Sequence, residues 1–117
     1  MIVRSGWVDG RKGKMTVKEY LINTVPETAD EDAIVVRDVA VCMDGFCLSI
    51  QASRAHYCVP RKTIKSGEYS FVEIGRLSEY QKKIETYRSG SVYAYVPIED
   101  VEELIKEHGG IRGNTYD

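Results

Sequence analysis

Hydrophobic and polar residues alternate along several short stretches of this chain, and a period of two predicts β-strands. In the clearest stretch, 46–53, every second side chain is apolar and the others are small and polar. The apolar set is Phe46, Leu48, Ile50 and Ala52. Alternation or a high content of β-branched residues predicts further strands at 2–8, 14–24, 34–42, 69–74 and 92–96. The strand at 46–53 should therefore turn one face to a core and leave the other polar.

Asp44-Gly45 separates two of these strands and is the strongest turn signal in the chain. Both residues tolerate the positive φ that a two-residue hairpin turn requires, and such a turn matches the twist of the strands. A two-residue turn places Cys42 opposite Cys47, with their α-carbons about 4.5 Å apart. The sequence therefore predicts a hairpin in which these two cysteines are neighbours.

A helical period replaces the alternation at 98–108. Apolar side chains recur there at helical spacing, at Ile98, Val101, Leu104 and Ile105. Acidic residues crowd the first turns, Lys106 and His108 lie near the end, and Gly109 follows as a favourable C-terminal cap. The segment 78–87 is a candidate second, short helix, although its apolar spacing is poorer.

These elements predict an α+β fold, a mostly antiparallel β-sheet built from hairpins with one clear C-terminal helix packed on it. The length of 117 residues predicts a single domain, 1–117. Within it we expect an N-terminal hairpin and acidic loop at 1–33, the central antiparallel sheet at 34–97, the helix at 98–109 and a tail at 110–117. The tail shows no periodicity.

Charge and composition narrow the class of function only slightly. A net charge of −2 argues against a general nucleic-acid-binding protein, which is usually basic. No apolar run approaches the roughly 18 residues needed to cross a bilayer, and the first residues lack the apolar stretch of a signal peptide. An odd count of three cysteines argues for reduced, structural thiols. We therefore expect a cytoplasmic protein that binds neither membranes nor nucleic acids in general.

Three cysteines and a histidine have the identities of zinc ligands: Cys42, Cys47, His56 and Cys58. Their spacing lacks the paired knuckles of structural zinc sites, and small buried residues on a hairpin are a simpler explanation for two of the cysteines. Cys58 and His56 also have the identities of a thiol nucleophile and its base, but no catalytic motif surrounds them. We therefore assign no metal, no cofactor and no catalytic residue.

A second group of residues suits a phosphate and a base. Arginine pairs with phosphate through parallel hydrogen bonds, and tyrosine or histidine stacks on bases. The candidate ligand-binding residues are Arg54, His56, Tyr57, Arg61, Tyr93, Tyr95 and Arg112. Four of them lie within 54–61, where a merely polar strand end is the alternative explanation. The tyrosines likewise suit a covered sheet face or a subunit interface.

The blocks 45–53, 56–61, 69–75, 93–97 and 106–111 resemble sequences of small proteins from tailed phages and prophages of Gram-positive bacteria. Among groups with an understood function, the chain is similar in size and in its sheet-plus-helix build to the phage anti-Thoeris family of signal-sequestering proteins. That resemblance implies an oligomer in the cytoplasm of the infected or lysogenic host. It also implies capture, without cleavage, of a cyclic ADP-ribose-type signal or a cyclic oligonucleotide.

The leading hypothesis is a non-enzymatic anti-defence protein that sequesters a nucleotide second messenger. Its arginines would bind the phosphates and its tyrosines would stack on the base. The alternatives are a protein-binding inhibitor of a host defence or regulatory protein, and a small metal- or thiol-dependent enzyme. We also expect a homo-oligomer, because the chain has eight tyrosines and one amphipathic helix cannot cover a whole sheet face.

Overall fold

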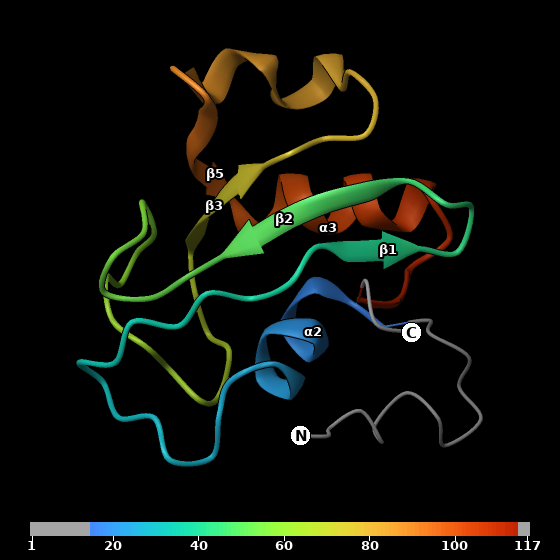
Figure 1. The fold of residues 1–117 in the computed structure, drawn as a ribbon. Helices are drawn as coiled ribbons and strands as arrows, with labels where there is room; N and C mark the ends of the chain where they lie inside the picture. Colours follow the sequence, from blue (N-terminus) through green and yellow to red (C-terminus); the bar gives the residue numbers. More distant parts are fainter. Residues whose placement is uncertain (1–14, 115–117) are drawn as a thin grey trace.

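The computed structural model describes residues 15–114 of the chain. Its strands form one six-stranded antiparallel sheet in the order β4-β5-β3-β2-β1-β6 (Figure 1). The strands are β1 (Ala40–Cys42), β2 (Cys47–Gln51), β3 (Phe71–Gly75), β4 (Arg88–Ser89), β5 (Val92–Pro97) and β6 (Ile111–Asn114). The helices are α2 (Val17–Asn23), α3 (Ile98–Glu107) and the 3₁₀ helix η1 (Lys82–Tyr87). The predicted α+β class is confirmed.

Helix α3 packs against the apolar face of the sheet and lies behind it in Figure 1. Its inward side chains are buried in one hydrophobic core together with Ile50 and Ile74 of the central strands. Those side chains are Val101, Leu104 and Ile105. The prediction of a C-terminal helix packed on the sheet is therefore confirmed. The helix begins at the predicted residue and ends one or two residues earlier than predicted.

The predicted strand at 14–24 is wrong, because this segment contains helix α2. Thr16 and Glu19 form a capping box, in which the Thr16 hydroxyl accepts from Glu19 N–H and the Glu19 carboxylate accepts from Thr16 N–H. The buried side chains of the helix recur at helical spacing, at Val17, Tyr20 and Leu21. The strand predicted at 2–8 lies outside the described residues.

Glu102 of α3 holds the start of α2. Its two carboxylate oxygens accept hydrogen bonds from Val17 N–H at 3.0 Å and from Lys18 N–H at 3.2 Å. The first N–H groups of a helix have no partner within the helix, and a negative charge is favourable at that end. The two helices are therefore joined where α2 begins.

The β1–β2 hairpin forms at the predicted place but with a loop of three residues, 43–45. Val41 pairs with Cys47, and Gly45 adopts φ +95° while its N–H donates to the Cys42 carbonyl at 3.0 Å. This geometry is a turn followed by a glycine bulge. Because a shift of one residue reverses the faces, Cys42 and Cys47 lie on opposite sides of the hairpin. The predicted cysteine pair is wrong: Cys42 is buried, and Cys47 is half-buried on the other face.

The remaining strands and turns follow the sequence with adjusted bounds. β2, β3 and β5 overlap the stretches predicted at 46–53, 69–74 and 92–96. The candidate helix at 78–87 is the shorter 3₁₀ helix η1. Part of the predicted tail forms β6, which pairs with β1 and extends the sheet at that edge. This edge strand is short and was not predicted.

Candidate ligand-binding groove

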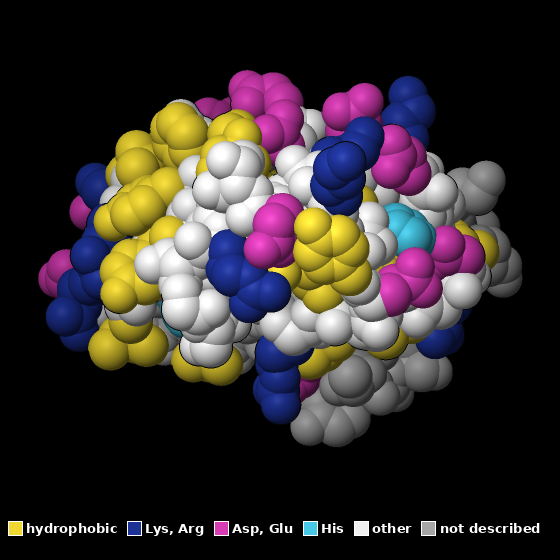
Figure 2. Space-filling model, turned by 90° about the horizontal axis from the view of Figure 1, so that it is seen from above, with side chains coloured by type: hydrophobic (Ala, Val, Ile, Leu, Met, Phe, Trp, Pro, Cys, Tyr) yellow, Lys and Arg dark blue, Asp and Glu magenta, His cyan; other side chains and the backbone are white. Residues whose placement is uncertain are grey.

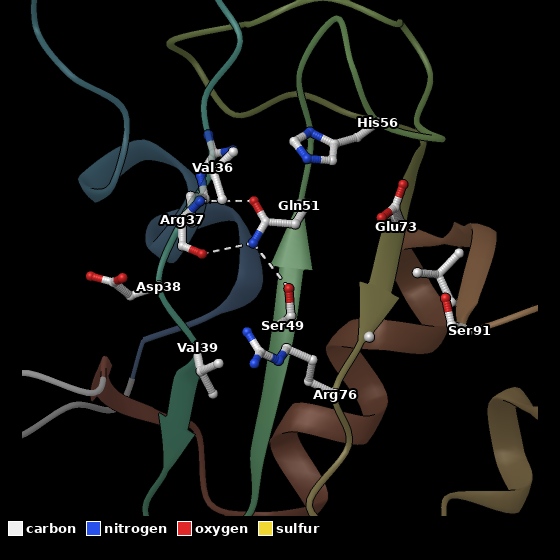
Figure 3. Close-up of a pocket in the computed structure, with 12 residues that line it drawn as sticks. Val36, Arg37, Asp38, Val39, Ser49, Gln51, His56, Glu73, Arg76 and Ser91 are labelled. Atoms are coloured by element: carbon white, nitrogen blue, oxygen red, sulfur yellow. Dashed lines mark hydrogen bonds between the residues drawn. The ribbon is translucent and has the colours of Figure 1, made fainter.

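A groove of about 800 Å³ lies over the face of the sheet opposite to α3 (Figure 3). The polar side chains of β2 and β3 form its floor, and the extended segment 36–39 forms one wall. Its polar lining includes Arg37, Ser49, Gln51, His56, Glu73 and Arg76. Alternation along β2 explains the division of faces, since Leu48 and Ile50 enter the core while Ser49 and Gln51 face the groove.

The groove exists because the chain leaves the sheet before β1. A strand was predicted at 34–42, but only 40–42 pair with β2. The side chain of Gln51 takes the place of a strand partner: its Oε1 accepts from Arg37 N–H at 2.8 Å, and its Nε2 donates to the Arg37 carbonyl at 2.7 Å. The same Nε2 donates to Ser49 Oγ at 2.9 Å. The floor is thus a fixed network of buried polar groups.

Arg37 belongs to the scaffold beneath the groove. The residue is 4% exposed, and its guanidinium donates to the carbonyls of Ala52 (2.8 Å) and Leu21 (3.3 Å) and to Thr24 Oγ1 (2.8 Å). Among the described residues it forms no salt bridge. Burial lowers the pKa of Arg37 from its usual value. All three nitrogens are engaged, so the charge stabilises the path of segment 36–39 and is not available to a ligand.

One end of the groove carries His56 and Glu73, which lie close to each other in Figure 3. His56 Nδ1 lies 2.8 Å from the hydroxyl of the buried Ser53. Burial lowers the pKa of His56, so its ring is neutral near pH 7. Glu73 accepts from Tyr57 N–H through Oε1 at 2.9 Å. This end therefore offers a neutral imidazole and a carboxylate that is held in place.

The other end carries Arg76, whose side chain extends across the floor toward Ser49 in Figure 3. It is exposed and pairs with no carboxylate among the described residues. Its backbone adopts φ +50°, and Tyr95 adopts φ +53°; these are the two non-glycine residues with positive φ within 15–114. Such strained positions cluster at functional sites. An unpaired guanidinium on a strained backbone, above a polar floor, is a candidate anion-binding group.

A small aromatic surface adjoins the His56 end of the groove, and we call its residues Tyr57, Tyr95 and Arg61 the tyrosine platform. The two rings are 5.7 Å apart between centroids and tilted by 44°, and Arg61 Cζ lies 5.4 Å from the centre of the Tyr57 ring. Tyr95 N–H donates to the Tyr57 carbonyl at 3.2 Å, and this bond joins the loop that carries Tyr57 to β5. The tyrosines are 42% and 41% exposed, so both rings can contact another molecule.

The space-filling view places this surface in context. Hydrophobic side chains gather toward the left of Figure 2, the side on which the loop 54–60 lies in Figure 1, with Lys and Arg side chains beside them. Two exposed hydrophobic residues of that loop are Tyr57 and Val59. The cis peptide bond between Val59 and Pro60 lies in the same loop.

The structure brings together five of the seven predicted ligand-binding residues. Arg61 Nε donates to the Arg54 carbonyl at 3.1 Å, and Arg54 Nε donates to the Asp32 carbonyl at 2.9 Å, so both arginines are partly engaged in the loop. His56, Tyr57 and Tyr95 lie beside them, as described above. Two residues lie elsewhere.

Tyr93 and Arg112 are the two that lie apart from the groove. Tyr93 is buried in the core beneath the guanidinium of Arg88, whose Cζ is 5.6 Å from the ring centre. Arg112 lies on β6, at the sheet edge farthest from β4 and β5. Neither residue lines the groove. Prediction from the sequence missed Glu73 and Arg76, which come close to Ser49 only because β2 and β3 are paired.

The candidate zinc ligands do not form a metal site. No group of three or more His, Cys, Asp or Glu side chains within 15–114 is arranged to hold a metal ion. Burial, together with Asp44 and Cys47, raises the pKa of the Cys42 thiol to about 12, and burial also raises the pKa of Cys58. Cys58 Sγ approaches the carbonyls of Ser53 and Pro60, at 3.3 and 3.4 Å. Both buried thiols are therefore protonated at neutral pH.

Comparison of the chain with protein-family models, with curated protein sequences and with solved structures gives no match. Among the helices described, none has both the length and the apolar character needed to cross a membrane.

Proposed function

We propose that this protein binds a small nucleotide signal in the groove and holds it without converting it. The observation that carries the proposal is the polar groove with the unpaired Arg76 at one end and the tyrosine platform beside the other. Its volume of about 800 Å³ falls within the range of roughly 300–1,000 Å³ that is usual for small-molecule sites. A ligand with an anionic group and a flat ring matches this arrangement.

The chemistry of the two ends supports a phosphate-bearing ligand. A guanidinium binds phosphate through parallel, charge-assisted hydrogen bonds, each worth about 1.5–3 kcal/mol. Stacking on an aromatic ring adds about 1–3 kcal/mol per base. Two hydrogen bonds from Arg76 and one stacked base therefore give roughly 4–9 kcal/mol before the cost of association. Micromolar binding needs about 8 kcal/mol net, so a tight complex requires contacts beyond these.

This shortfall favours a site completed by a second copy of the chain. We propose a homo-oligomer, most simply a symmetric dimer, in which the exposed tyrosine platform of one subunit helps to cover the ligand in the groove of the other subunit. Light scattering at micromolar concentration should give a mass of at least twice the 13.2 kDa of one chain. A mass near that of one chain, with ligand bound, would contradict the shared site.

The state of the candidate catalytic groups favours sequestration over turnover. Both buried thiols are protonated because burial raises their pKa. The Ser53 hydroxyl is hydrogen-bonded to His56 but is fully buried, so it cannot reach a substrate in the groove. With the resemblance to signal-sequestering proteins of phages, this suggests an anti-defence role in the cytoplasm of an infected or lysogenic bacterium.

Titration calorimetry with cyclic ADP-ribose isomers and cyclic di- and trinucleotides tests the proposal, followed by mass spectrometry of the recovered ligand. We expect at least one member to bind and to be recovered unchanged. Arg76→Ala should weaken binding about ten-fold or more through the loss of charge-assisted bonds. Arg112→Ala is the matched control, because it removes an exposed arginine at the far edge of the sheet and should not change the affinity.

Two outcomes would contradict the proposal. Recovery of an altered ligand would indicate an enzyme. Equal effects of the two arginine variants would indicate attraction by surface charge without a site in the groove.

A second candidate function rests on the exposed hydrophobic residues Tyr57, Val59 and Tyr95, each between 41% and 42% exposed. Clusters of this kind also occur at protein–protein contacts, which are enriched in tyrosine. The protein would then inhibit a host defence or regulatory protein through this surface. Absence of heat with every nucleotide, together with loss of inhibition in cells by Tyr57→Ser, would favour this function.

A further inference from the structure

The His56 end of the groove has a defined pattern of hydrogen-bond donors and acceptors. Glu73 presents its carboxylate there; Oε1 already accepts from Tyr57 N–H at 2.9 Å, which fixes the orientation of the group. Each carboxylate oxygen can accept two hydrogen bonds, so Oε2 and the second site on Oε1 remain for a ligand. Asp38, the other acidic residue of the lining, points away from the groove in Figure 3. The Glu73 carboxylate can therefore accept hydrogen bonds from two neighbouring donors of a ligand.

The histidine beside it supplies a donor. Ser53 Oγ accepts from Ala55 N–H at 3.2 Å and lies 2.8 Å from His56 Nδ1. We assign the Ser53 hydroxyl as the donor to Nδ1 in this pair. Because the ring is neutral, its remaining hydrogen is then on Nε2. The end of the groove thus combines one N–H donor with a carboxylate that accepts two.

This pattern matches the edge of one base. Guanine presents an oxygen acceptor at O6, followed by the two donors N1–H and N2–H. Adenine presents one acceptor and one donor on the corresponding edge, and cytosine presents only one donor. Because His56 would donate to O6 while Glu73 accepts from N1–H and N2–H, guanine makes three hydrogen bonds where adenine makes two. A flipped or free base is commonly read on this edge.

We infer that the ligand carries guanine, with its base edge at His56 and Glu73 and its phosphate at Arg76. This inference rests on the proposed function, and it favours a guanine-containing cyclic oligonucleotide over a cyclic ADP-ribose-type signal. Glu73 and Arg76 lie toward opposite ends of the groove in Figure 3, so they can bind opposite ends of one nucleotide. The base then lies beside the tyrosine platform.

Calorimetry with two matched pairs tests the inference: GMP against AMP, and cyclic di-GMP against cyclic di-AMP. We expect the guanine member of a pair to bind at least about ten-fold more tightly, equivalent to ~1.4 kcal/mol. Glu73→Gln should abolish most of this preference. Its amide oxygen can still accept from Tyr57 N–H, so the fold is retained, and thermal unfolding checks this. Glu99→Gln, an exposed residue in the first turn of α3, is the control and should leave the preference unchanged.

The outcomes separate the two proposals. If guanine and adenine nucleotides bind equally and Arg76→Ala weakens both, the assignment of guanine is wrong while the binding function stands. A preference that survives in Glu73→Gln also overturns the assignment, because the carboxylate would then not contact the base. If no nucleotide binds at all, both the assignment and the proposed function fail.

Discussion

Replacement of Gln51 by leucine should release the wall of the groove. Gln51 is 7% exposed, and its side-chain amide provides both the acceptor for Arg37 N–H and the donor for the Arg37 carbonyl. Leucine has a similar size but no hydrogen-bonding group. It therefore leaves two buried backbone groups without a partner, each at a cost of about 1–3 kcal/mol. The added apolar burial recovers part of this, so we expect a loss of ~2–4 kcal/mol.

Such a loss is a large fraction of the ~5–15 kcal/mol that stabilises a typical domain. Urea unfolding, monitored by circular dichroism, measures the free energy, and hydrogen exchange at the Arg37 amide reports the local effect. Ser49→Ala is the control, because it removes only one acceptor of the Gln51 amide and should cost about 1 kcal/mol or less. A loss below ~0.5 kcal/mol in Gln51→Leu, with Arg37 exchange unchanged, would refute the argument that this side chain replaces a strand partner.

Three further predictions concern the hairpin and its neighbours. Hydrogen bonds from Phe46 N–H and then from His108 Nδ1, at 2.6 Å, lower the pKa of Asp44. The contribution of Asp44 to stability is therefore complete above the unfolded pKa of about 3.9 and disappears as the pH falls through the lower folded pKa. The difference in unfolding free energy between Asp44→Asn and the native chain should shrink over that pH range in urea titrations. Gly109→Ala should destabilise by more than ~1 kcal/mol in thermal unfolding, because φ is +91° and an added Cβ would lie 2.9 Å from Met43 Cβ; an unchanged midpoint would contradict the packing. The Cys42 thiol should resist iodoacetamide at pH 8 until the chain is unfolded in urea, since its pKa is about 12, and mass spectrometry of the native protein would reveal any labelling that contradicts this.

The parts of the fold that were predictable are those where one local signal dominates. Strand β2 follows from strict alternation, and helix α3 from apolar spacing and its flanking charges. The strand predicted at 14–24 failed because alternation was preferred to two helical signals in the same segment, the Thr16/Glu19 capping box and the spacing of Val17, Tyr20 and Leu21. That error was avoidable from the sequence.

The groove could not have been predicted in the same way. Segment 36–39 has β-branched residues and was assigned to a strand, but the burial of the Arg37 guanidinium against the carbonyls of Leu21 in α2 and of Ala52, just after β2, draws it out of the ladder. This contact joins residues far apart in sequence, and tertiary contacts of this kind override local propensity. The pairing of β2 with β3 then brings Glu73 and Arg76 to the floor, which no local pattern could indicate.

The capping of α2 by Glu102 has a consequence for the order of folding. Helix α2 has seven residues, too few to be stable alone, and the carboxylate that completes its first turn is 85 positions away from Val17 along the chain. We therefore expect residues 17–23 to become ordered only after α3 has packed on the sheet. Since α2 also supplies the Leu21 carbonyl that holds Arg37, the wall of the groove would close in the last steps of folding and open in the first steps of unfolding.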